Sequence, residues 1–139
     1  MSISQFDRKQ PEEISNRPEL PLVEAVRLAP SARNRQPWYL ACKEGCIDFY
    51  CRKGGLIDNT LLKNLHWFDI GIAVCHAVLA LQEEGFSPIP VIRPDPPERA
   101  GCIYGISLNI NPAKSAEIPA KYRTNKRRNF IRRFDLLPL

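Results

Sequence analysis

The sequence predicts an α+β fold from the order of its segments. A short amphipathic helical segment is followed by two β-prone runs, and a long apolar helical segment then leads to two further β-prone runs. Helices and strands therefore come in blocks, not in the strict alternation typical of a parallel sheet. The 139 residues, 44% hydrophobic and 25% charged, are enough for one globular domain.

The chain divides into a polar leader over residues 1–18, a folded body over 19–112 and a basic tail over 113–139. We expect the leader, which contains two prolines, to be loose. Glu19–Ala29 carries apolar residues at helical spacing and is predicted to be the first helix, which Pro30 ends.

A β-hairpin is predicted next. Trp38–Lys43 and Cys46–Arg52 are apolar and β-prone, and Glu44-Gly45 between them is a good turn signal. Gly54-Gly55 should end the second strand.

The long helix is predicted over Leu61–Glu84, and Gly85 should stop it. Its centre, Ile70–Leu81, has no charged residue, and His76 is its only strongly polar one. A helix that is apolar nearly all round should be buried on most sides. A chain with two substantial helices offers few neighbours, so another copy, a partner chain or a missing half should cover it.

Two more strands are predicted, over Phe86–Arg93 and Cys102–Ile110, with a proline-rich connection at 94–97 between them.

The net charge of +5 is a property of the tail. Residues 1–120 hold 13 Lys/Arg against 14 Asp/Glu, which gives −1, whereas residues 121–139 hold seven basic residues against Asp135, which gives +6. A nearly neutral body makes nucleic acid an unlikely partner. A nucleic-acid contact through the basic tail alone stays open as a weaker hypothesis.

A cytoplasmic location is expected, with no membrane contact. No uninterrupted apolar run approaches ~20 residues, and the N-terminus lacks the apolar centre of a signal peptide. The five cysteines are odd in number and form no CxxC pair, which indicates reduced thiols and no metal site. His66 and His76 are ten residues apart on one helix, about 15 Å of rise, too far to share a metal ion.

The most informative stretch is the loop from Pro30 to Pro37. Its prolines fix the backbone, and Ser31, Asn34 and Gln36 supply hydroxyl and amide groups that both donate and accept. Such groups suit the edge of a flat heterocycle with carbonyls and ring nitrogens. Local capping of the turn is the alternative interpretation.

The stretch Ala-Pro-Ser-x-x-Asn-x-Gln-Pro-Trp, residues 29–38, resembles the flavin-site loop of the FMN-dependent nitroreductase family. The resemblance extends over residues 20–110, through the preceding helix (22–28), the hairpin (43–50) and the buried central helix that starts at Asp69-Ile-Gly-Ile. It is strongest to the branch in which one chain carries two nitroreductase-like halves.

This resemblance implies a partial nitroreductase-like fold, with the body as one half domain and FMN lying between two halves or two subunits. The matching cofactor-binding positions are Pro30, Ser31, Asn34 and Gln36. Gly71, in the central helix, would let the cofactor come close, or is a small packing residue. The implied reaction passes electrons from NAD(P)H through the flavin to a nitroaromatic or quinone-type acceptor, and it needs no catalytic acid, base or nucleophile from the protein.

The chain departs from the family pattern at its start. The family's Arg/Ser-rich phosphate-binding segment should precede the first helix, but residues 1–18 offer only Arg8, Lys9 and Arg17. The chain therefore resembles the C-terminal half of a two-half protein, which would work as a homodimer or with a complementary half. The alternative is a non-catalytic remnant or assembly subunit without flavin of its own. The tail faintly resembles the Arg-rich element, or is a solvated basic tail.

Overall fold

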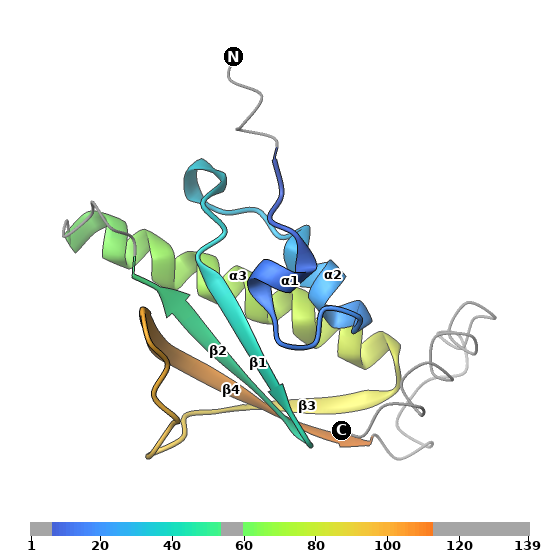
Figure 1. The fold of residues 1–139 in the computed structure, drawn as a ribbon. Coiled ribbons are helices and arrows are strands. Elements are labelled where there is room, and N and C mark those ends of the chain that lie inside the picture. The colour runs from blue at the N-terminus through green and yellow to red at the C-terminus, as the bar shows by residue number, and fades with distance from the viewer. Residues whose placement is uncertain (1–6, 54–59, 113–139) are drawn as a thin grey trace.

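The chain forms one antiparallel sheet with its helices on one face (Figure 1). The computed structural model describes residues 7–53 and 60–112. The elements are α1 (Pro11–Ile14), α2 (Pro21–Arg27), the 3₁₀ turn η2 (Ala32–Asn34), β1 (Trp38–Lys43), β2 (Cys46–Arg52), α3 (Thr60–Glu83), β3 (Phe86–Val91) and β4 (Cys102–Pro112). The strand order is β1-β2-β4-β3, and all neighbours pair antiparallel. The predicted α+β class is confirmed.

The predicted hairpin is confirmed with the same strand bounds. Its turn uses Gly45 at φ 67°, a conformation that glycine adopts without strain. The long helix also forms, one residue earlier at each end than predicted, and Gly85 follows it at φ 89°. The first helix is shorter than predicted. It begins at Pro21, which suits the first helical position, and it ends at Arg27.

We had expected the leader to be loose, but it is structured from residue 7 onward. α1 lies within it, with a capping box between Gln10 and Glu13, and the Ile14 side chain is fully buried in the core. A four-residue helix gives almost no periodic signal, which explains why the sequence did not predict it. The predicted basic tail lies outside the described residues.

The core lies between α3, α2 and the sheet. Its α3 members are Ile70, Ala73, Ala77 and Leu81, which pack with Leu22, Val23 and Val26 of α2 and with Leu40, Phe49 and Leu108 of the sheet. A glycine in β4 permits the close approach of α3: a Cβ on Gly105 would lie 3.2 Å from the Phe49 carbonyl oxygen and 3.3 Å from the Trp67 ring.

One side of α3 is exposed within this chain, so its predicted burial on most sides depends on the cover that was predicted from another copy, a partner chain or a missing half. Trp67 is 41% exposed, Phe68 72% and Leu79 62%. The segment Asn64–Glu83 is long and apolar enough to cross a membrane, which qualifies the expectation of no such run, although core helices of soluble proteins meet the same criterion. Here α3 packs against α2 and the sheet. The exposed side still calls for a cover.

The opposite face of the sheet carries a buried carboxylate. Asp48 has no exposed surface; its oxygens accept from Arg93 Nη1 at 2.8 and 3.0 Å and from Ser107 Oγ at 2.5 Å. Lys43 Nζ lies 3.1 Å away. Burial favours the neutral acid, but these donors outweigh it and hold the pKa of Asp48 below its ordinary value.

Candidate functional site

The loop between α2 and β1 has a strained backbone. Three residues other than glycine adopt left-handed conformations, Arg33 at φ 52°, Asn34 at 54° and Gln36 at 50°. Each such residue costs about 1–2 kcal/mol. Strain of this kind persists only where surrounding contacts enforce it, and it gathers at functional sites.

Contacts with the segment Asp7–Lys9 enforce this backbone. The Gln36 side chain, 2% exposed, accepts from the Lys9 N–H at 2.8 Å and donates to the Asp7 carbonyl at 3.0 Å. Asn34 Nδ2 donates to the same carbonyl at 2.7 Å. Lys9 Nζ also donates to the Gln36 carbonyl at 3.2 Å. Sequence reasoning missed these contacts, because they join segments at least 27 positions apart and most of them use the backbone groups of Asp7 and Lys9.

The predicted site residues therefore differ in their roles. Gln36 is buried and bonded within the chain, so it shapes the loop. Ser31 Oγ accepts from the Gln36 N–H at 2.9 Å, which leaves the hydroxyl proton of this half-buried residue available. Asn34 is half-buried, and Pro30 is exposed at the start of the loop. Local bonding accounts for the described contacts; contact with a flavin stays a prediction.

An acidic residue of α3 fastens the loop to the helix. Asp69 Oδ1 accepts from the Ala32 N–H at 3.0 Å, and Asp69 is only 3% exposed. Burial raises the pKa of Asp69, although the bond from Ala32 opposes that shift. Asp69 Oδ2 and His66 Nε2 are also buried, and neither has a hydrogen-bond partner among residues 7–53 and 60–112.

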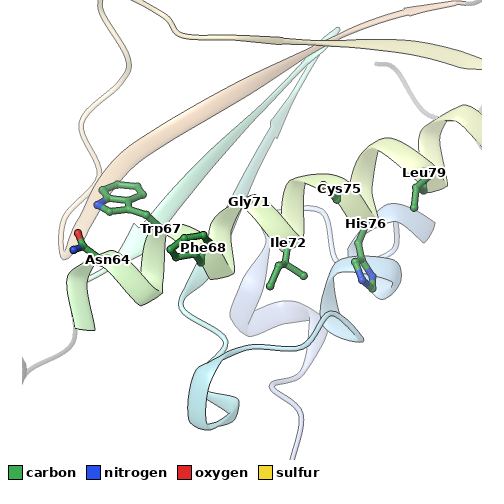
Figure 2. Close-up of a pocket in the computed structure, with 8 residues that line it drawn as sticks. All are labelled: Asn64, Trp67, Phe68, Gly71, Ile72, Cys75, His76 and Leu79. Atoms are coloured by element: carbon green, nitrogen blue, oxygen red, sulfur yellow. The ribbon is translucent and has the colours of Figure 1, made fainter. Parts of the chain in front are cut away.

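A shallow apolar groove runs along the exposed side of α3, and Figure 2 shows the side chains that line it. They are Asn64, Trp67, Phe68, Gly71, Ile72, Cys75, His76 and Leu79. All of them belong to α3, so the part of the chain that the structure describes supplies one wall of the groove.

Gly71 lies in this groove and not beside the polar groups of the loop. A Cβ built on it would meet nothing within 4 Å among the described residues. Close approach of a cofactor at Gly71 stays a prediction, with a small packing residue as its alternative.

No metal site is formed by the described residues, where no three His, Cys, Asp or Glu side chains gather. Cys42 and Cys46 are separated by the alternation of strand side chains, with Cys42 packed in the core and Cys46 beside Asp48 on the other face. His76 Nδ1 lies 3.0 Å from the Ala25 carbonyl oxygen, so this ring is engaged with α2 rather than with Cys75.

Comparison with known proteins agrees with this architecture. A crystal structure described as a "putative nitroreductase" from Thermotoga maritima matches 76% of this chain with a TM-score of 0.54 and 26% identity. The fold is thus that of a nitroreductase-like protein. The family model "Putative TM nitroreductase" matches residues 2–81, and the chain belongs to that family. It spans 43% of the length of the Thermotoga chain. No curated protein matches it.

Proposed function

We propose that this chain is one half of an FMN-dependent oxidoreductase that passes electrons from NAD(P)H through the flavin to a nitroaromatic or quinone-type acceptor. The observation that carries the proposal is the placement of a strained polar loop beside a bare apolar helix face, in a chain of the nitroreductase family. A cytoplasmic location is part of the same proposal.

The residues fit a flavin ring in two respects. The groove along α3 offers apolar side chains and an open glycine, Gly71, against which a flat ring can lie. The adjoining loop offers the Ser31 hydroxyl for the polar edge of a ring, and the Asn34 side chain, bonded to Asp7 and Gln36, lies in the same loop. A bound flavin would supply the redox chemistry, so the protein's contribution is placement.

Each part of the loop has a proposed task. Ser31 donates its hydroxyl proton to the ring edge, and Asn34 lies beside it. Gln36 and Asp69 act indirectly, because one fixes the turn against Asp7–Lys9 and the other fastens it to α3. Pro30 restricts the approach of the loop from α2.

This proposal includes a second chain, because residues 7–53 and 60–112 form one wall of the groove. A homodimer or a complementary half would cover Trp67, Phe68 and Leu79 and complete the enclosure. Apolar patches of this kind on soluble chains typically mark interfaces.

The alternative is a non-catalytic remnant or assembly subunit that holds no flavin. One observation favours it: the Gln36 amide is used within the chain.

The purified full chain, mixed with excess FMN, separates the two by its visible spectrum and its size in solution. The proposal expects an associated species with the absorption of bound flavin. Phe68→Glu should abolish both association and colour, whereas Leu28→Glu, at an exposed apolar residue of the α2 end, should abolish neither. A colourless wild-type species that associates through α3 supports the alternative, and a colourless monomer contradicts the proposal.

A further inference from the structure

The connection between β3 and β4 is fastened over the sheet face that α3 does not cover. In Figure 1 this connection lies on the side of the sheet away from the helices. The Tyr50 hydroxyl donates to the Pro97 carbonyl at 2.7 Å, and the Arg93 N–H donates to the Tyr104 hydroxyl at 3.1 Å. The Arg93–Asp48 ion pair adds a third attachment. The loop is therefore held in a defined position.

A pocket of about 640 Å³ lies between this loop and β2. Its functional side chains are Tyr50, Lys53, Glu98, Arg99, Cys102 and Tyr104. Both tyrosine hydroxyls are engaged, with the Pro97 carbonyl and with Ser107 and Arg93. The Lys53 N–H donates to the Gly101 carbonyl at 2.8 Å, which fixes the strand end against the loop. The side-chain donors that remain are those of Lys53 and Arg99.

Positive charge gathers at this pocket. The Arg99 guanidinium carbon lies 3.5 Å from the centroid of the Tyr39 ring, and that of Arg52 lies 5.5 Å from the same centroid. Within residues 7–53 and 60–112, neither Lys53 nor Arg99 forms an ion pair.

We propose that this pocket binds an oxyanion of the phosphate class, with Arg99 and Lys53 as its direct contacts. Stacking on Tyr39 holds the planar Arg99 fork in place, and such a fork matches phosphate oxygens with two parallel hydrogen bonds. Arg52, near the same Tyr39 ring, adds to the local positive charge. Glu98 is the one carboxylate in the lining, so positive charge exceeds negative charge there. The site is separate from the proposed flavin site, because the sheet lies between them.

The test uses the full chain and inorganic phosphate, titrated at constant ionic strength with chloride as the balancing anion. Backbone amide NMR shifts at Arg99 and Gly101, together with calorimetry, report binding at the pocket. Arg99→Gln should weaken phosphate binding about tenfold or more, because a charge-assisted contact is lost. Lys53→Gln should weaken it less. Arg17→Gln removes an exposed cation that pairs with Glu19 elsewhere, so it should change nothing.

Urea unfolding of each variant shows whether it folds, and Lys53→Gln serves if loss of the Tyr39 stack unfolds Arg99→Gln. A comparison of inorganic phosphate, 2′-adenosine monophosphate and adenosine identifies the source of the anion. The site is supported if the monophosphate binds more tightly than inorganic phosphate, or if the two bind equally, provided that Arg99→Gln weakens the binding in either case. Absence of saturable shifts at Gly101, equal binding of adenosine, or equal losses in Arg99→Gln and Arg17→Gln would overturn it.

Discussion

The Asp69 carboxylate accepts the backbone N–H of Ala32 at 3.0 Å, across 37 positions of sequence. This bond joins the strained loop to the helix whose exposed side forms the groove. The loop and the helix therefore form one unit, and the position of the Ser31 and Asn34 side chains depends on an acid buried two turns into α3.

Asp69→Ala should destabilise the fold by about 1–3 kcal/mol, because it leaves the Ala32 N–H unpaired. Asp69→Asn keeps an acceptor oxygen and should cost less. Urea unfolding at neutral pH measures both. Equal stability of the Ala variant and the wild type would show that this bond does not fasten the loop.

The raised pKa of Asp69 also predicts a pH dependence. The folded state holds the proton to a higher pH than the unfolded state, so stability should fall as pH rises from about the ordinary value of 3.8 through the folded-state pKa. Asp69→Asn has no carboxyl group to titrate, so it lacks this pH dependence. The unfolding free energy of wild type minus that of Asp69→Asn should therefore increase as pH falls through the folded-state pKa. A difference that is constant across pH would contradict the assignment.

Asn34→Ala should weaken FMN retention without unfolding the protein. It removes the bond to the Asp7 carbonyl, and alanine tolerates φ 54° poorly, so a loss of about 1–2 kcal/mol in stability is expected as well. Asn34→Gly is the matched control, since it removes the side chain but relieves the backbone. Visible absorbance after gel filtration measures retained flavin. Full flavin occupancy in both variants would show that Asn34 is not part of the proposed flavin site.

The sequence predicted most of the fold because its strong patterns are local. The hairpin of β1 and β2 has a turn glycine between two β-prone runs, and α3 is long and uniformly apolar. The polarity of α3 could not reveal which side stays exposed, because Phe68 and Ile70 are equally apolar and only the packing of the sheet separates them.

The candidate site was less predictable for a related reason. Ser31, Asn34 and Gln36 were identified as polar loop residues, but their hydrogen bonds depend on residues 7–9, which lie far away in sequence. The prediction that the loop contacts a flavin came from the family resemblance. Chemistry alone left capping and cofactor contact as alternatives.

Trp38→Ala tests the packing at the start of β1. Trp38 is fully buried in the core, so its truncation should cost about 3–5 kcal/mol. Leu28→Ala, at a residue that is 54% exposed, should cost far less. Urea midpoints compare the two. Similar midpoints would mean that the Trp38 side chain is not packed in the core as the structure shows.

Asp48→Asn tests the buried carboxylate on the opposite face of the sheet. It leaves Arg93 and Lys43 without their shared anion, but both cations are partly exposed, so the expected loss is about 1–3 kcal/mol rather than that of a fully buried pair. Because the folded-state pKa of Asp48 is lowered, its contribution is present above the ordinary value of 3.8 and is lost as pH falls toward the folded-state pKa. The variant should therefore be less stable than wild type at neutral pH and should approach it in acid.

Glu19→Gln, which breaks the exposed pair with Arg17, is the control and should change stability by no more than about 0.5 kcal/mol. A deficit in Asp48→Asn that persists unchanged in acid would show that the hydrogen-bonding shape of the carboxylate, and not its charge, holds the β3–β4 connection in place.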